Sequence, residues 1–435
     1  MKRSEARARI SRELGNRRLI WLGISGEDAR GLAVVPQLSH SYSVHSSYEA
    51  EGVEAVSVES LTGQRHFDYD IAVFLGAQGR PLVESFTRAI SEPAVLVSYS
   101  PYAFIDYILG TSGAGYLGNP YATFQAVSDK PTVEAALGDM GVSTIPWMLL
   151  PENGQRMNNL RARLRKGPVV LRSSKQDGGA GHELIEDGQQ VVASKLARLR
   201  EPISVAPYLD EHVPLCIGAC VFPDGGITLH PPSFQLVGIK ACSRYDFGYC
   251  GNDFGAVKGL DDQALETVER CVRAAGDWLH GQGFVGAFGV DVLVRDDEAV
   301  FVEINPRFQG SSSMSAELDE VMDRPDVYMD HLMACLGLPS YASPPLAEQA
   351  RSQASRSQLH CLNLREGAVG LRADGMDLPE GVSATLLPKP GIRVGAGSLL
   401  FTLQVEGSVT ENGKNIGPAA AAAVRAGLAA FEACA

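Results

Sequence analysis

The sequence lacks the features that would place the protein in a membrane, outside the cell or on nucleic acid. It has no run of about 20 uncharged apolar residues, so no membrane-spanning helix is predicted. Residues 1–18 are basic but contain no apolar stretch of the kind that a signal peptide needs. Positive charge is scarce, with 38 Lys and Arg against 51 Asp and Glu, and the net charge of −13 opposes attraction to phosphate backbones. We therefore expect a cytoplasmic protein with no membrane or nucleic-acid partner.

Cysteine is too sparse and scattered for a zinc site or a disulfide framework. The eight cysteines of the 435-residue chain form no CxxC pair, and no histidine lies at a zinc-binding spacing from them. We expect these cysteines to be reduced and mostly buried. Cys242 and Cys250 flank a loop-like segment, so an alternative is that they approach a ligand.

The composition is that of a folded protein of about three domains. With 45% apolar and 20% charged residues, the chain can bury a substantial core. Domains usually contain roughly 100 to 200 residues, so this length allows about three. We predict an α/β fold with three parts. They are an N-terminal α/β layered domain (1–125), a two-lobed central domain (126–338, with lobes at 130–207 and 208–338), and a linker with a small β-rich C-terminal domain (339–435).

Short apolar runs in the first third of the chain predict parallel strands with crossover helices. These runs begin at Leu19, Ile71 and Ala94, and a loop follows each of them. The pattern Gly113, Gly115 and Gly118 matches a dinucleotide-binding motif but follows no clear strand. The motif therefore gives only weak support to the alternative that the protein is an NAD-dependent oxidoreductase.

The central part begins with a helix that has a lysine at its start. Over residues 128–141, Ser128 or Asp129 can cap the helix and Pro131 suits its first turn. This prediction places Lys130 at the N-terminal edge of the helix.

Several later segments also have recognisable patterns. Residues 167–185 read as a hairpin with a glycine-rich tip, and residues 260–280 place apolar side chains at three- and four-residue steps, which predicts a surface helix. Residues 339–358 are rich in Ser, Ala, Gln and Pro and are the predicted linker. Beyond them we expect short strands and a final alanine-rich helix from Gly417.

The densest chemical pattern lies in residues 284–310. Two apolar runs flank a polar turn near residue 297, which predicts an antiparallel hairpin. In a symmetric hairpin Asp291 lies nearly opposite Glu303, and Asn305 points to the same face as Glu303 because side chains alternate along a strand.

Two carboxylates and an amide on one face suggest a metal site. Their charges would repel one another without a cation between them, and a set of oxygen ligands suits Mg²⁺ or Mn²⁺. Arg307, which follows closely, can hold two phosphate oxygens at once. The pattern therefore predicts a metal-bound phosphate ligand. The alternative is an edge hairpin with a solvated acidic face.

This constellation resembles the nucleotide site of the ATP-grasp ligases, which implies an α+β ATP-grasp core. The resemblance implies that Asp291, Glu303 and Asn305 hold two Mg²⁺ ions on ATP and that Arg307, as a catalytic residue, steadies the transferred phosphate. It covers residues 115–320 and keeps the family's order of elements. It also implies that Lys130 contacts the phosphates, that a glycine-rich loop closes over them and that a hinge frames the adenine. The matching loop and hinge residues are Gly178, Gly179, Gly181, Ala206, Tyr208 and Leu209.

The sequence departs from the family pattern at two positions. Arg172 stands where a lysine is usual, and it keeps the charge but not the geometry. Ala206 stands near the place of a glutamate that contacts adenine, so recognition of the base would fall to backbone groups. Lys175 offers another phosphate contact, or it is a solvated loop lysine in a flexible hairpin tip.

The resemblance implies an ADP-forming enzyme that activates a carboxylate as an acyl phosphate and joins it to an amine. The chain looks similar to the peptide ligases of bacterial natural-product and antibiotic pathways, typified by that of pheganomycin biosynthesis. An amino acid or peptide acceptor is therefore expected, and a homodimer is possible. In the aromatic segment 234–254, Lys240 and Arg244 are the predicted contacts of a substrate carboxylate, unless they are ordinary surface charges. The alternatives are a non-catalytic nucleotide-binding regulator and a carboxylate-amine ligase of primary metabolism.

Overall fold

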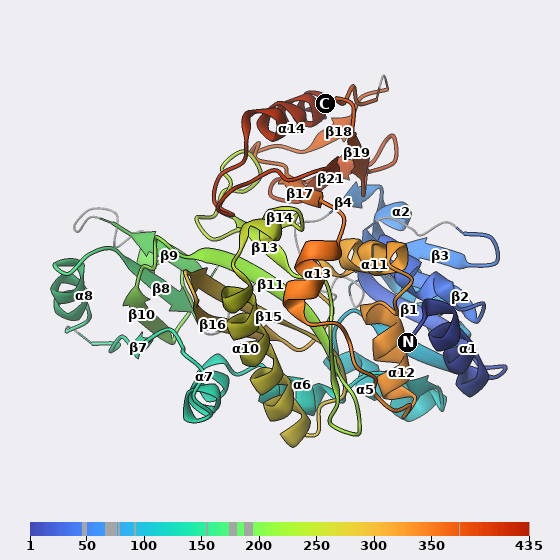
Figure 1. The fold of residues 1–435 in the computed structure, drawn as a ribbon. Helices are drawn as coiled ribbons and strands as arrows, with labels where there is room; N and C mark the ends of the chain where they lie inside the picture. Colours follow the sequence, from blue (N-terminus) through green and yellow to red (C-terminus); the bar gives the residue numbers. More distant parts are fainter. Residues whose placement is uncertain are drawn as a thin grey trace.

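The computed structural model describes residues 1–45, 50–65, 76, 79–90, 93–153, 155–173, 181–186, 195–373 and 375–434. In these ranges the chain forms four sheets with helices packed against them (Figure 1). None of the described helices is long and apolar enough to cross a membrane. The strand predicted from Ile71 lies outside the described residues.

The N-terminal part is a parallel sheet with helices around it, as the runs at Leu19 and Ala94 predicted. Its elements are α1 (Arg3–Leu14), β1 (Arg18–Ser25), the 3₁₀ helix η1 (Glu27–Val34), β2 (Leu38–His45), β3 (Glu54–Ser57), α2 (Val58–Thr62), β4 (Gln64–Arg65), α4 (Arg80–Ala89), β5 (Ala94–Ser98), α5 (Ala103–Ser112), β6 (Gly115–Tyr116) and α6 (Tyr121–Val127). The strand order is β3-β2-β1-β5-β6, and every pairing is parallel. Trp21 of β1 packs against Phe308 of the central part, with ring centroids 5.9 Å apart.

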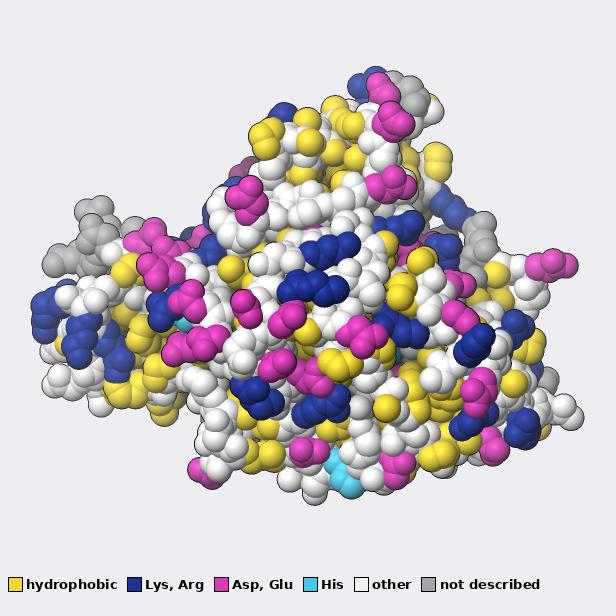
Figure 2. Space-filling view, in the orientation of Figure 1, with side chains coloured by type: hydrophobic (Ala, Val, Ile, Leu, Met, Phe, Trp, Pro, Cys, Tyr) yellow, Lys and Arg dark blue, Asp and Glu magenta, His cyan; other side chains and the backbone are white. Residues whose placement is uncertain are grey.

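A small antiparallel lobe follows, which we call the glycine-loop lobe (residues 130–207). Its elements are α7 (Lys130–Asp139), β7 (Met148–Leu149), α8 (Arg156–Leu164), β8 (Val169–Ser173), β9 (His182–Ile185) and β10 (Ile203–Pro207), and its strand order is β7-β10-β8-β9. As predicted, Asp129 caps α7 by accepting the N–H of Thr132 at 3.2 Å. The arginines of α8 give this lobe a basic outer face at the left of Figure 2, whereas acidic and basic side chains alternate elsewhere on that view.

The core of the molecule is a mixed layer of strands and helices that includes the hairpin of interest. Its elements are β11 (Val213–Val221), β12 (Ile227–Leu229), β13 (Ser233–Val237), β14 (Tyr249–Asp253), η2 (Ala256–Gly259), α10 (Asp262–Gly281), β15 (Gly286–Arg295), β16 (Glu298–Asn305), α11 (Ser312–Val321) and α12 (Val327–Cys335). Helix α10 buries Leu265, Val268 and Val272 against one face, which confirms the predicted amphipathic helix. Helix α12 packs with Cys220 and Ala287 in a second core cluster that also contains Trp21.

The C-terminal part is rich in strands, as expected, but three of them extend the central sheet. Its elements are α13 (Leu346–Ser352), β17 (Arg356–Leu362), β18 (Val369–Leu371), β19 (Val382–Thr385), β20 (Arg393–Val394), β21 (Leu399–Glu406), α14 (Pro418–Ala429) and β22 (Phe431–Ala433). The central sheet runs β16-β15-β11-β13-β14-β17-β21-β19, with β12 on β11, and a small sheet runs β22-β18-β20-β4. The alanine-rich helix begins at Pro418, next to the predicted Gly417.

The segment predicted as a linker is folded onto the core instead of connecting two units freely. Helix α13 lies within residues 339–358, and its Leu346 and Ala350 are fully buried in the cluster around α10. Two apolar residues one turn apart are enough to dock a short helix, although the segment is polar overall.

The cysteines are free thiols, and six of the eight are buried, which confirms the expectation from their number and spacing. Cys242 and Cys250 belong to the core cluster of the C-terminal part. Both side chains are fully buried, as the first of the two expectations states.

Candidate functional site

The hairpin β15–β16 has the register that the sequence predicted. Asp291 pairs directly with Glu303, and Gly289 pairs with Asn305. The register shifts by one residue between this site and the turn, so Val302 is the extra residue of a β-bulge. The pairing brings both carboxylates and the amide together, because residues that face each other across two strands have Cβ atoms about 5 Å apart.

Asp291 is buried with half of its carboxylate unsatisfied. Its Oδ2 accepts hydrogen bonds from Nδ2 of Asn305 at 3.2 Å and from Nε2 of Gln235 at 3.3 Å. Its Oδ1 is buried and has no hydrogen-bond partner in the described part of the chain. Burial, together with the charge of Glu303, raises the pKa of Asp291 to about 7. The thiol of Cys216 and the charge of Arg307 act against this rise, but no cation in the described part of the chain forms an ion pair with Asp291.

Glu303, in contrast, has an internal cation. Nζ of Lys130, at the start of α7, lies 3.0 Å from its Oε2. Burial opposes ionisation of Glu303, but the ammonium of Lys130 outweighs it and lowers the pKa of this carboxyl to about 2. The structure thus brings two predicted residues that are 173 positions apart in sequence into contact.

Arg307 lies beside the amide of the same cluster. Its Nη2 donates to Oδ1 of Asn305 at 3.1 Å and its Nη1 donates to the carbonyl of Phe308 at 2.9 Å. Nη1 also donates to the hydroxyl of Tyr99 at 3.4 Å, and the guanidinium carbon lies 5.6 Å from the centroid of the Tyr99 ring. The N-terminal sheet therefore helps to hold this arginine in place.

The cluster fits a divalent cation with oxygen ligands. Two carboxylates and an amide oxygen are donors that Mg²⁺ and Mn²⁺ prefer, and the unsatisfied Oδ1 of Asp291 is the kind of atom that a bound cation would satisfy. Among the described residues, no group of three His, Cys, Asp or Glu is placed to hold a metal ion. Any such site here therefore depends on Asn305 as its third protein donor.

Arg172 is in the glycine-loop lobe, where its charge is already neutralised. The side chain is almost fully buried, and its Nη1 and Nη2 both donate to the carboxylate of Glu134, Nη2 at 3.0 Å. Its guanidinium also lies over the ring of Trp147, 4.1 Å from the centroid. Arg172 therefore ties α7 to β8, and phosphate binding would have to compete with Glu134.

Of the predicted loop contacts, only Gly181 is described. Its carbonyl accepts the N–H of Ser173 at 2.8 Å. Lys175, Gly178 and Gly179 lie outside the described residues. The next residue, His182, is described as well: burial, and then the charges of Lys130 and Arg172, lower its pKa to about 3.

The predicted hinge lies at the end of β10. Ala206 is buried and pairs with Val170, and its neighbours Tyr208 and Leu209 follow the strand. The ring of Tyr208 lies edge-on to that of Phe247, 6.3 Å between centroids, and Nζ of Lys414 lies 5.4 Å from the Tyr208 centroid. A C-terminal residue thus contacts the hinge, which the sequence did not indicate.

Lys240 and Arg244 have other partners. The side chain of Lys240 is exposed, and its Nζ lies 2.7 Å from Oδ1 of Asp246. The other oxygen of Asp246 forms an ion pair with Lys195 of the glycine-loop lobe. Arg244 donates to the carbonyl of Leu364. Their role in substrate binding stays a prediction.

Two residues of the site were missed by sequence reasoning. Gln235 donates to Asp291 from β13, and Tyr99 holds Arg307 from the end of β5. A glutamine on a strand and a tyrosine after one carry no motif, so only the pairing of distant strands could identify them.

Comparisons with known proteins agree on the fold. A family model described as an ATP-grasp domain matches residues 230–311. The chain is 25% identical over 316 residues to the formate-dependent phosphoribosylglycinamide formyltransferase of Geobacter metallireducens, covering 71% of this chain and 68% of that protein. It is 24% identical over 277 residues to the arginine-specific carbamoyl phosphate synthase large chain of Geobacillus stearothermophilus.

Solved structures add a likeness over nearly the whole chain. The biotin carboxylase domain dimer of the Hydrogenobacter thermophilus 2-oxoglutarate carboxylase, in complex with MgADP, ADP and bicarbonate, superposes with a TM-score of 0.64 at 13% identity. The match covers 96% of this chain and 90% of that one. The match to the carbamoyl phosphate synthase large chain covers 61% of this chain but only 25% of that protein.

Proposed function

This chain has the ATP-grasp fold, and on that premise we propose that it is an ADP-forming ligase that joins a carboxylate to an amine. The proposed donor is a small carboxylic acid, and the proposed acceptor is an amino acid or the N-terminus of a peptide. The finer proposal is peptide bond formation in the biosynthesis of a natural product, including antibiotics. A relative whose name specifies formate, a carboxylate, supports the donor class.

One cluster supports this proposal most directly. Asp291, Glu303 and Asn305 converge with the cations Lys130 and Arg307, while one carboxylate oxygen of Asp291 is left unsatisfied. An unsatisfied buried charge is costly, so a purely structural role does not account for it. A metal-bound polyphosphate would supply the missing cation and would also use the two basic side chains.

The proposed reaction has two steps. An oxygen of the donor carboxylate attacks the γ-phosphorus of ATP, which forms an acyl phosphate and releases ADP. The amine nitrogen of the acceptor then attacks the acyl carbon, inorganic phosphate leaves, and the nitrogen loses a proton. Each step builds negative charge on phosphate oxygens, so catalysis depends on positive groups that are already in place.

The residues of this chain have separate roles in the proposal. Asp291, Glu303 and Asn305 would hold Mg²⁺, or Mn²⁺ in its place, in a pair of ions. When bound, these ions would neutralise charge on the phosphates of ATP. Arg307 would act as the catalytic residue that stabilises the transferred phosphoryl group, and Lys130 would turn from Glu303 to the phosphates.

The remaining nucleotide contacts belong to the same proposal. Arg172 and the loop residues Lys175, Gly178, Gly179 and Gly181 would contact phosphates, whereas Ala206, Tyr208 and Leu209 would frame the adenine. Lys240 and Arg244 are proposed to bind a substrate carboxylate, which would require them to leave Asp246 and Leu364. A homodimer is also proposed, with support from the dimer described for the Hydrogenobacter domain.

The test is release of ADP by the purified protein with ATP, Mg²⁺ and pools of carboxylic acids, amino acids and short peptides. We expect release that depends on a substrate pair and an amide product by mass spectrometry. Glu303→Gln should abolish it. The matched control is Glu298→Gln, five residues away on the same strand but exposed, which should leave it intact. Tight ATP binding without turnover in any pool would favour the regulatory alternative, and an unchanged rate in Glu303→Gln would overturn the proposal.

A further inference from the structure

A cavity lies away from the hairpin, between the α11–α12 connection and the segment before α13. Its volume is about 330 Å³, at the lower end of the roughly 300 to 1,000 Å³ that is usual for small-molecule sites. It is lined by Leu229, Asp319, Arg324, Pro325 and Tyr341, and also by Met1, Ala342, Ser343, Pro344 and Glu348. None of these residues belongs to the candidate nucleotide site.

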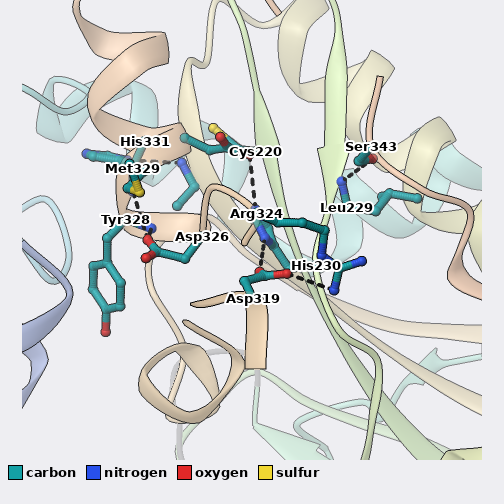
Figure 3. A network of polar contacts seen from close by, with 12 residues as sticks. Cys220, Leu229, His230, Asp319, Arg324, Asp326, Tyr328, Met329, His331 and Ser343 are labelled. Atoms are coloured by element: carbon teal, nitrogen blue, oxygen red, sulfur yellow. Dashed lines mark hydrogen bonds and ion pairs between the residues drawn. The ribbon is translucent and has the colours of Figure 1, made fainter. Parts of the chain in front are cut away.

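One side of this cavity rests on a buried network of charges (Figure 3). Oδ2 of Asp319 lies 2.8 Å from Nδ1 of His230, and its Oδ1 lies 3.0 Å from Nη2 of Arg324. On the other side of the imidazole, Nε2 of His230 lies 3.3 Å from Asp330 Oδ2, and Tyr341 donates to both oxygens of Asp330 at 3.0 Å. His230, Asp319 and Asp330 are buried, so this side of the cavity is held in one arrangement.

Arg324 gives the cavity a positive side that its own partner does not saturate. Asp319 divides its charge between His230 and Arg324. Nε and Nη2 of Arg324 have no well-formed hydrogen bond to any described residue but are themselves buried, so a ligand would meet the 15% of the side chain that remains accessible. A guanidinium is permanently charged and planar, so the anion that fits it best is a carboxylate or a phosphate.

Glu348 places a negative charge at the rim of the cavity. It is exposed in the first turn of α13, and its carboxylate has no ion pair with any described residue. Part of the lining is apolar and fixed: Leu229 is buried, and its N–H donates to Ser343 Oγ at 3.0 Å. Pro325 and Pro344 add rigid apolar surface.

We propose that this cavity binds a small zwitterion of the α-amino acid class, with its carboxylate on Arg324 and its ammonium toward Glu348. A carboxylate is favoured over a phosphate because two acidic side chains, Asp319 and Glu348, line the same small space and would repel a more highly charged anion. The apolar walls suit a short aliphatic side chain. The site is independent of the proposed ligase activity.

The test is equilibrium binding by calorimetry to the full chain without ATP or metal. The proteinogenic amino acids are titrated singly, and the tightest binder is then compared with its amine-free acid and its carboxylate-free amine. We expect saturable binding of one or more amino acids and at least about tenfold weaker binding of both analogues, since each loses a charged contact. No saturable binding of any amino acid would overturn the proposal, and so would an amine-free acid that binds as tightly as its parent.

Four variants locate the ligand. Arg324→Met should weaken binding at least about tenfold, and Ala342→Trp, at an exposed position of the lining, should block the cavity without touching the charged network. Arg351→Met is the matched control, because this arginine of α13 binds the 258–262 segment instead. Binding that survives Ala342→Trp, or that is lost in Arg307→Met but kept in Arg324→Met, would place the ligand elsewhere and overturn the proposal.

Discussion

Two pairs of carboxylates lie on the same lobe of this molecule, and they differ in how their charges are balanced. Asp319 and Asp330 share the imidazole of His230, and each has a further partner, Arg324 and Tyr341 respectively. In the hairpin pair, Lys130 forms an ion pair with Glu303, whereas Asp291 accepts from two amide donors and its Oδ1 has no hydrogen-bond partner among the described residues. We call the first pair complete, because the cation His230 lies between its two carboxylates, and the second pair incomplete, because Asp291 has no ion pair with any described residue.

The difference indicates a structural role for the carboxylates of the complete pair and a ligand-binding role for those of the incomplete pair. A buried ion pair contributes when its members satisfy one another, and it is strongly destabilising when a partner is missing. Burial raises the pKa of both Asp319 and Asp291, but His230 and Arg324 act against this at Asp319, whereas the neighbouring Glu303 adds to it at Asp291. A chain keeps such an incomplete pair where a ligand completes it.

The largest expected effect is at the incomplete pair, where a substitution should abolish most of the activity without lowering the stability. Asp291→Asn should lower substrate-dependent ADP release about a thousandfold, since it removes a charge that acts on the transferring phosphates. The free energy of unfolding should stay the same or increase, because a buried carboxylate without a cation is removed. Activity assays and urea unfolding check the two parts, and a clear loss of stability would show that Asp291 is a structural residue.

The complete pair should behave in the opposite way. His230→Leu leaves Asp319 and Asp330 without their shared cation and should lower the free energy of unfolding by about 3 to 5 kcal/mol. The affinity for ATP of the protein that remains folded should not change. Denaturant unfolding and calorimetry measure these quantities, and a variant as stable as the wild type would refute the network's role.

The pH dependence of stability should follow His230. Burial opposes its charge, but Asp319 and Asp330 outweigh burial and raise its pKa to about 10. Because the folded pKa lies above the unfolded value of about 6.5, the contribution is full below pH 6.5 and is lost as pH rises toward 10, by up to about 1.4 kcal/mol per pH unit. His230→Gln should flatten this slope, and equal slopes in both proteins would argue against a charged His230.

The smallest effect is expected from the amide that orients Asp291. Gln235→Leu removes the 3.3 Å hydrogen bond to Oδ2 and should weaken the affinity for Mg²⁺ with ATP roughly tenfold, as is usual for residues behind metal ligands. Gln404→Leu, on β21 of the same sheet, is the control. Equal affinities in wild type and Gln235→Leu would mean that Asp291 needs no such support.

Local patterns predicted the hairpin but not its surroundings. The opposition of Asp291 and Glu303 followed from the centre of one short turn, and it is confirmed. The bulge at Val302 moves the buried positions from Ala299 and Phe301 to Ile304. It could not be predicted, because residues 299–302 are all apolar and do not show where the alternation shifts. The apolar face of α10 could be predicted for the same reason as the hairpin: each pattern is contained in a continuous segment of about 20 residues.

The missed contacts are the ones that join distant segments. His230 contacts Asp319 and Asp330 across 89 and 100 positions, and Arg172 contacts Glu134 across 38 positions that include β7 and α8. The pairing of β14 with β17 joins the C-terminal part to the central sheet. The short apolar runs predicted strands in the C-terminal part but not this pairing. Propensity and spacing do not determine which strand edges meet, so these contacts required the structure.

The most direct test of the incomplete pair is the affinity of ATP measured by calorimetry with and without Mg²⁺, in wild type and in Asp291→Asn. If the hairpin holds a metal-bound nucleotide, Mg²⁺ should tighten ATP binding at least about tenfold in the wild type and have little effect in the variant. The same affinity with and without Mg²⁺ in the wild type would contradict the account.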